Sequence, residues 1–136
     1  MPEAAEEADK LKIYLQQQGV QTILQAPLPD EQFHRRLADE KFDLLIALGG
    51  DGTMLRAGHL CGPLGIPILG INLGRFGFLI EIKREHWMEM LPLLFEGRYR
   101  LESRMMLNVE HLRGDQCLTS GSALNEVVVS RGRYVR

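Results

Sequence analysis

Residues 43–53 read Asp-Leu-Leu-Ile-Ala-Leu-Gly-Gly-Asp-Gly-Thr, and this stretch decides the fold. Its first half is a short and almost wholly apolar run, which is typical of a buried strand. Its second half places three glycines around Asp51, which predicts a tight loop at the carboxyl end of that strand. Glycine lets a neighbour approach the backbone amides closely, so we expect a phosphate-cradling loop. The residues of that loop are Gly49, Gly50, Gly52 and Thr53.

The segments around this stretch alternate between helix and strand. The expected helices cover residues 2–18, 31–40, 53–60 and 84–96, and the expected strands cover residues 20–24, 43–48 and 67–71. We expect Asp30 and Thr53 to cap the second and third helices. This alternation predicts an α/β fold, with a parallel Rossmann-like sheet and flanking helices. A second glycine-rich loop, residues 72–79, follows the strand at 67–71, so both loops lie where such sheets bind ligands.

The spacing of apolar residues changes after residue 98. Residues 99–102 alternate, residues 106–112 continue as an extended segment, Arg113-Gly114-Asp115 is typical of a hairpin turn, and residues 123–129 resemble a further strand. So few strands cannot bury both faces of a sheet. We therefore predict an α/β domain over residues 1–98, followed by the incomplete start of a β-rich second domain over residues 99–136.

The composition is that of an ordinary globular protein. The 136 residues include 16 basic and 18 acidic side chains, and 45% of them are hydrophobic. We expect no nucleic-acid partner, because the chain lacks a basic surplus, and no membrane partner, because no stretch approaches the roughly 18 apolar residues of a span. Cys61 and Cys117 have no metal or redox spacing, and the acidic amino terminus lacks the parts of a signal peptide. Both observations favour a cytoplasmic protein.

Asp51 is the first candidate for chemistry. A carboxylate in a glycine turn at a helix start can accept a proton from a hydroxyl, bind a sugar hydroxyl or help to hold a divalent cation. The alternative is an aspartate that only shapes the turn by bonding to nearby amides. The neighbouring glycines favour a functional role, because a structural turn does not need three of them.

Asn125 and Glu126 form the second candidate, because both are poor strand residues set inside an apolar run. They would face a ligand or a subunit contact, unless one of them simply faces water. The four histidines have no metal-ligand spacing, so we predict no metal site built from protein side chains alone.

Apolar and basic residues near the two loops are further candidates. Phe76, Phe78 and Leu79 could offer an apolar surface to an adenine ring or a ribose, or they could pack beneath the loop. Arg56 and Arg75 flank the loops, where a guanidinium could bind phosphate or remain solvated.

Three windows of the chain together resemble the NAD kinase family. Gly49-Gly50-Asp51-Gly52-Thr53 is similar to the family's signature, which lipid and sugar-phosphate kinases of the same superfamily share. Residues 70–79 resemble the second NAD kinase motif almost throughout, and Asn125-Glu126 resembles the third. The motifs occur in order, and the resemblance covers nearly the whole chain.

This resemblance implies an enzyme that phosphorylates the adenosine-ribose 2′-hydroxyl of NAD to give NADP. The donor would be ATP or polyphosphate, with a divalent metal cation, Mg²⁺ foremost, as cofactor. Asp51 would accept the proton. The implied nucleotide-binding residues are Asp51, Gly52, Arg56, Phe78, Asn125, Glu126 and Arg136. Family members are commonly dimers or tetramers, and exposed strand edges also favour a homo-oligomer.

The chain departs from the family pattern at both ends, so we expect it to be truncated at both. The strand that normally precedes the first helix is missing, as are a threonine- and glycine-rich nucleotide-binding stretch and most of the β-domain. A general base accelerates a reaction by roughly 10²–10⁴-fold, and positioning of the phosphate donor supplies much of the remaining rate enhancement. We therefore predict a weakly active or inactive portion of a kinase. The alternatives are a non-catalytic nucleotide-binding or interaction domain derived from the family, and a lipid or sugar kinase of the superfamily.

Overall fold

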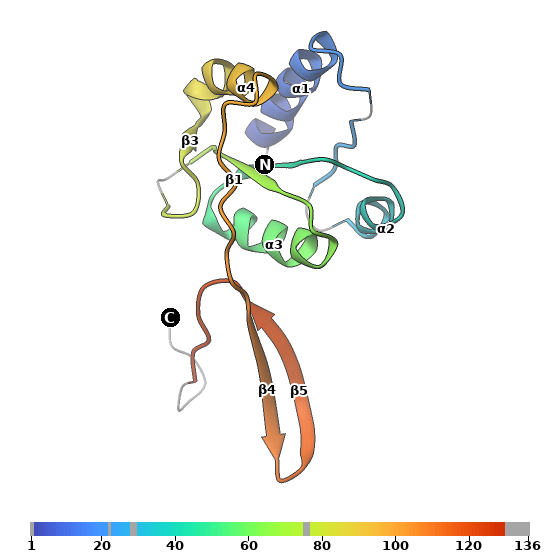
Figure 1. Ribbon diagram of the computed structural model, residues 1–136, viewed down its shortest axis with the longest axis vertical. Coiled ribbons are helices and arrows are strands. Elements are labelled where there is room, and N and C mark those ends of the chain that lie inside the picture. Colours follow the sequence, from blue (N-terminus) through green and yellow to red (C-terminus); the bar gives the residue numbers. More distant parts are fainter. Residues whose placement is uncertain (1, 22, 28–29, 75–76, 130–136) are drawn as a thin grey trace. The chain divides into compact units, whose positions relative to one another are not determined.

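The computed structural model describes residues 2–21, 23–27, 30–74 and 77–129 (Figure 1). The chain divides into two compact units, Met1–Leu101 and Glu102–Arg136. Each unit has its own sheet, and the two sheets differ in the direction of their strands.

A three-stranded parallel sheet lies at the centre of the first unit. Its middle strand, β2 (Ile68–Asn72), pairs with β1 (Leu45–Gly49) on one side and with β3 (Ile82–Lys83) on the other. In the β1–β2 register Ala47 lies opposite Gly70. The predicted parallel sheet is confirmed. Strand β3 was not expected, because two paired residues are too short to produce a periodic pattern.

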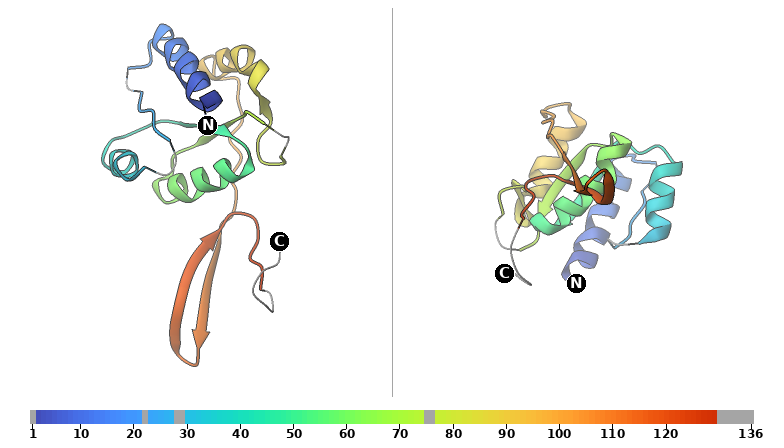
Figure 2. Two further views of the ribbon diagram at one scale, coloured as in Figure 1. Left: turned by 180° about the vertical axis from the view of Figure 1, so that it is seen from behind. Right: turned by 90° about the horizontal axis from the view of Figure 1, so that it is seen from below.

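Four α-helices within the described residues pack around this sheet (Figures 1 and 2). They are α1 (Pro2–Gln17), α2 (Glu31–Asp39), α3 (Asp51–Cys61) and α4 (Trp87–Phe95), with the 3-10 helices η1 (Gly62–Leu64) and η2 (Arg84–His86). The predicted cap of α2 is confirmed, because the Asp30 side chain accepts a hydrogen bond from the Phe33 N–H at 2.9 Å. None of the helices in the described residues combines the length and the apolar character that crossing a membrane requires.

Side chains of β1 point alternately to the two faces of the sheet, and a separate core cluster lies on each face. Leu45 and Ala47 pack with residues of α2 and α3, whereas Ile46 and Leu48 pack with residues of α1 and α4. The buried residues of the first cluster are Phe33, Leu37, Leu45, Ala47, Ala57 and Cys61. Those of the second are Leu11, Ile71, Trp87 and Leu91. Because helices cover both faces of β1, residues 43–48 are almost entirely apolar.

Two expectations for the first unit are wrong. The described residues among 20–24 form no strand; Leu24 instead packs against the cluster beside α2 and α3. Helix α3 begins at Asp51 with Gly50 as its N-cap, so Thr53 lies inside the helix and does not cap it. Thr53 is not the N-cap because the Gly50 carbonyl already accepts the first helical hydrogen bond, from the Met54 N–H at 3.1 Å.

An antiparallel hairpin forms the second unit. Strands β4 (Leu107–Arg113) and β5 (Gln116–Ala123) meet at a tight turn in which Gly114 has a φ of 59°. The turn lies where the sequence predicts it. Residues 99–102, which alternate in the sequence, form no strand. The strand expected at residues 123–129 is wrong, because the segment directly after the turn pairs with β4 and the resulting strand β5 ends at Ala123. Strand β5 is polar and lacks apolar alternation. The turn, and not a periodic pattern, is therefore the sequence signal that predicts its pairing with β4.

Candidate functional site

The candidate site lies where the carboxyl ends of β1 and β2 meet. Gly49 ends β1 and pairs in register with Asn72, which ends β2. The Leu73 N–H donates a hydrogen bond to the Gly49 carbonyl at 3.2 Å, which extends the contact into the loop. The parallel register therefore brings the two glycine loops to the same edge of the sheet, as the sequence predicts.

The Asp51 carboxylate joins the two loops. Its Oδ2 accepts a hydrogen bond from the Phe78 N–H at 3.0 Å, and its Oδ1 accepts one from the Leu79 N–H at 3.2 Å. Asp51 is half-buried and is the first residue of α3, where free N–H groups favour a negative charge. A carboxylate offers about four acceptor positions, so each oxygen can still accept another donor. The aspartate thus shapes the structure, through the amides of the second loop, and keeps capacity for a ligand.

Gly77 lies directly against this carboxylate. A Cβ atom at position 77 would overlap Cγ, Oδ1 and Oδ2 of Asp51. At Gly74, in the same loop, a Cβ atom would meet no atom of the described residues within 4 Å, the chain neighbours of Gly74 aside. The two glycines of this loop therefore have different structural requirements.

Asn72 shapes the start of the second loop. Its side chain is buried, and its Oδ1 accepts a hydrogen bond from the Gly74 N–H at 2.9 Å. An asparagine that bonds to the amide two residues further on is a common way to begin a turn. Neither Asn72 nor Gly77 was singled out as a site residue from the sequence. A polar residue at the end of the apolar run 67–71 is the signal that could have identified Asn72.

The structure separates the roles that the sequence left open for the loop residues. The Phe78 side chain is 74% exposed, whereas Leu79 is buried in the core. Gly52 and Arg56 are exposed on α3, and the Thr53 side chain lies against the backbone of Gly49. Arg75, Phe76 and Arg136 lie outside the described residues.

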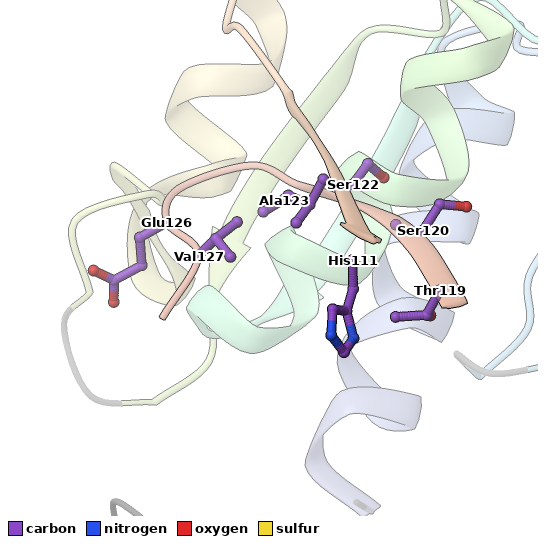
Figure 3. A pocket seen from close by; sticks show the side chains of 9 residues that line it. His111, Thr119, Ser120, Ser122, Ala123, Glu126 and Val127 are labelled. Carbon is purple, nitrogen blue, oxygen red and sulfur yellow. The ribbon is translucent and has the colours of Figure 1, made fainter. Parts of the chain in front are cut away.

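Asn125 and Glu126 lie together in the second unit, beyond the end of β5, and both are exposed. Glu126 helps to line a shallow depression on the hairpin, and its carboxylate points away from the ring of His111 (Figure 3). The other lining residues are Val109, His111, Thr119, Ser120, Gly121, Ser122, Ala123 and Val127. Both residues are open to solvent and neither is part of a strand, so their contact with a ligand or a subunit stays a prediction.

A second carboxylate, Glu7, is buried between α1 and the segment that begins with η2. Its oxygens accept hydrogen bonds from the Trp87 Nε1–H and the Arg84 Nε–H, both at 2.8 Å. Burial raises the pKa of Glu7, but these hydrogen bonds and the charges of Arg84 and Lys10 outweigh it and lower the pKa below 4.5. Because these partners belong to the protein itself, Glu7 links elements of the fold.

Within the described residues, neither the cysteines nor the side chains of metal-binding types form a further cluster. Cys61 and Cys117 are both free, and burial raises the pKa of Cys61 to about 11, so its thiol is protonated at neutral pH. Among residues 2–129, in the parts that the structure describes, no three side chains of His, Cys, Asp or Glu gather closely enough to hold a metal ion.

Together, the parallel sheet and its two glycine loops define a Rossmann-like α/β domain with a candidate site at the carboxyl edge of its strands. Comparison with known families then places the chain more closely. The family model described as the ATP-NAD kinase N-terminal domain matches residues 3–99. The chain therefore belongs to the NAD kinase family, and the resemblance drawn from its motifs is confirmed.

Individual relatives agree with this assignment. An NAD kinase from Caldanaerobacter subterraneus is 43% identical over 106 residues, which cover 76% of this chain and 38% of the relative. An NAD kinase from Heliobacterium modesticaldum is 38% identical over 142 residues, which cover 99% of this chain and 50% of the relative. The chain thus spans half or less of the length of these relatives.

A solved structure supports the fold. Yeast NADH kinase, complexed with NADH, matches 61% of this chain and 24% of its own chain, with 27% sequence identity and a TM-score of 0.50. The matched part of that enzyme is therefore a minor share of its length. The match with this solved structure agrees with the α/β architecture of the first unit.

Proposed function

We propose that this chain forms the α/β part of an NAD kinase, which phosphorylates the adenosine-ribose 2′-hydroxyl of NAD to give NADP. The observation that carries the proposal is the junction of the two glycine loops at Asp51, in a chain that belongs to this family. The names of the relatives support the reaction, and the NADH bound to the yeast enzyme supports a dinucleotide substrate.

In this proposal Asp51 accepts the proton of the ribose hydroxyl. The 2′-oxygen attacks the terminal phosphorus of ATP or polyphosphate, the bond from phosphorus to the leaving phosphate oxygen breaks, and the hydroxyl proton passes to the carboxylate. The amides of Phe78 and Leu79 occupy one acceptor position on each carboxylate oxygen, so the remaining positions are available to the hydroxyl. The amides at the start of α3 favour a phosphate nearby.

Other residues would bind the nucleotides. The exposed ring of Phe78 is available to pack against the nucleoside, and Arg56 on α3 is available to bind a phosphate. We propose that Asn125 and Glu126 bind the NAD ribose and its surroundings. Arg136 is proposed as a further ligand contact on the family resemblance alone.

The divalent cation that the family implies would enter with the phosphate donor. Mg²⁺ is usually bound through one or two carboxylates together with substrate phosphates, and it keeps several waters. The described residues contain no group of three side chains that would fit a metal cage made by the protein alone.

For the 136 residues by themselves we propose weak turnover or none. The matched segments make up 50% or less of the kinases from Caldanaerobacter and Heliobacterium, so half or more of each relative has no counterpart in the alignment. The same observation supports the second candidate, a nucleotide-binding domain without catalysis. NAD binding without NADP production, in every context tested, would favour that candidate.

A chimaera tests the proposal. This chain replaces the matching segment of the Heliobacterium modesticaldum NAD kinase, an alignment that covers 99% of this chain. We expect the chimaera to produce NADP, and we expect Asp51→Asn to lower its kcat by about 10²–10⁴-fold, the usual contribution of a general base. The control is Arg35→Ala, at a side chain that is 79% exposed on α2. Near-normal kcat for Asp51→Asn would refute the role of Asp51. Robust turnover by the 136 residues alone would refute the proposed weak activity.

A further inference from the structure

We infer that Gly77 is a positioning residue for Asp51, because the absence of a side chain at position 77 leaves the space that the carboxylate occupies. The inference rests on the proposed function, in which Asp51 accepts the proton. Gly77 does not touch the reacting atoms. It acts by letting the second glycine loop hold the carboxylate in one orientation.

The Asp51 carboxylate occupies the space beside Gly77. A Cβ atom at position 77 would overlap the carboxyl carbon and both oxygens of Asp51. The backbone of Asp51 is held by α3, so the side chain could make room only by rotating or by pushing the loop away. Either change would disturb the hydrogen bonds to Phe78 and Leu79, because these residues follow Gly77 directly in the chain.

The atoms that would meet a side chain at position 77 all belong to Asp51. The three heavy atoms nearest to a Cβ atom at this position are Cγ, Oδ1 and Oδ2 of Asp51. The volume that an alanine side chain would need is therefore occupied by the carboxylate. Removing the carboxylate should free this volume.

The amides of Phe78 and Leu79 require acceptors from the group that faces them. Backbone N–H groups only donate, so the group that faces Phe78 and Leu79 must offer an acceptor to each of them. A carboxylate meets this requirement with both oxygens, and each oxygen then has a defined direction for its next donor. A displacement of about 1 Å from such a geometry can cost about 100-fold in rate.

A double-mutant cycle in the 136-residue chain tests the contact without any activity. The extra methyl group of Gly77→Ala overpacks the space beside Asp51. In a unit of about 100 residues we expect this overpacking to lower Tm by roughly 5–15 °C. In an Asp51→Ala background we expect Gly77→Ala to lower Tm by less than about 2 °C, because the overlapping atoms are gone. Gly74→Ala is the matched control in the same loop, and its Tm should stay within about 2 °C of the parent.

The result that overturns the inference is an equal loss of Tm in both backgrounds. If Gly77→Ala alone does not fold, the double variant decides the matter. A double variant that folds as well as Asp51→Ala supports the inference, and one that fails to fold beside a folded Asp51→Ala overturns it.

Amide exchange gives a second measurement, on the hydrogen bonds themselves. We expect the Phe78 and Leu79 amides to exchange at least about tenfold faster in Gly77→Ala than in the parent chain, and at an unchanged rate in Gly74→Ala. Unchanged exchange of both amides in a folded Gly77→Ala would overturn the inference.

Kinetics of the chimaera separate this inference from the proposed function. We expect Gly77→Ala to lower kcat by about 100-fold and to change the KM for NAD by less than about threefold, because orientation and not binding is lost. If Asp51→Asn abolishes turnover and Gly77→Ala does not change it, the positioning role fails and the function stands. If Asp51→Asn has no effect, the function fails, while the Tm cycle still reports on the contact.

Discussion

The two units of this chain are stabilised in different ways. In the first unit helices cover both faces of β1, and the side chains of Ile71, Trp87 and Leu91 are less than 2% exposed. In the second unit no described residue is buried, and residues 102–129 are all exposed or half-buried. An isolated two-stranded hairpin is marginally stable in water. The first unit therefore has a core of its own, and the hairpin depends on further packing.

This difference bears on the proposed site. Asp51 is held at the edge of a sheet with a packed core, and its carboxylate is bonded to the backbone of the same unit. Asn125 and Glu126 follow a hairpin strand whose side chains are mostly exposed. A residue on a packed element is held more precisely than one on a weakly packed segment. Three substitutions, in order of expected effect, test this contrast.

Leu91→Ala should cause the largest loss of stability. Leu91 is fully buried in the cluster beside α1 and α4, so truncation should lower the free energy of unfolding by about 2–5 kcal/mol. Urea unfolding followed by the fluorescence of Trp87, the one tryptophan of the sequence, measures it. Met90→Ala, at a side chain that is 43% exposed, is the control. A loss of less than about 1 kcal/mol at Leu91 would contradict the assignment of this core.

Glu7→Gln should have an intermediate effect that depends on pH. An amide keeps one acceptor oxygen and loses the other, so the variant should be less stable at pH 7 by about 1–3 kcal/mol. The folded pKa of Glu7 lies below 4.5, so the ionised form stabilises the fold. That contribution is complete above the unfolded pKa and is lost as the pH falls through the folded pKa.

The difference in the free energy of unfolding between the parent chain and Glu7→Gln should therefore become smaller as the pH falls below 4.5. Urea unfolding at neutral and acidic pH measures this difference. Glu31→Gln, at a side chain that is 92% exposed on α2, provides the comparison variant. A difference that stays constant with pH would show that the Glu7 charge does not contribute.

Leu112→Ala should have the smallest effect. Leu112 lies in β4 and is 53% exposed, so its truncation should change the stability of the first unit by less than about 0.5 kcal/mol. The same unfolding measurement at Trp87 applies. A loss as large as that of Leu91→Ala would mean that the hairpin contributes to the core, and the contrast between the two units would fail.

Much of the first unit could be predicted from the sequence because the signals were local. The apolar run at 43–48 identified a strand covered on both faces, and Asp30 identified the start of α2. The strands that the sequence did not predict, β3 and β5, lack a local signal of their own. Strand β3 has only two residues, and β5 is polar, so each is recognisable only through the strand with which it pairs.

The candidate site shows the same division. The sequence by itself determined the glycine turn after β1, the carboxylate within it and the family to which the chain belongs. Only the tertiary structure decided that the amides of Phe78 and Leu79 hold this carboxylate and that Gly77 must leave room for it. The reason is physical. The two loops are separated along the chain, and the parallel register of β1 and β2 is what brings them together.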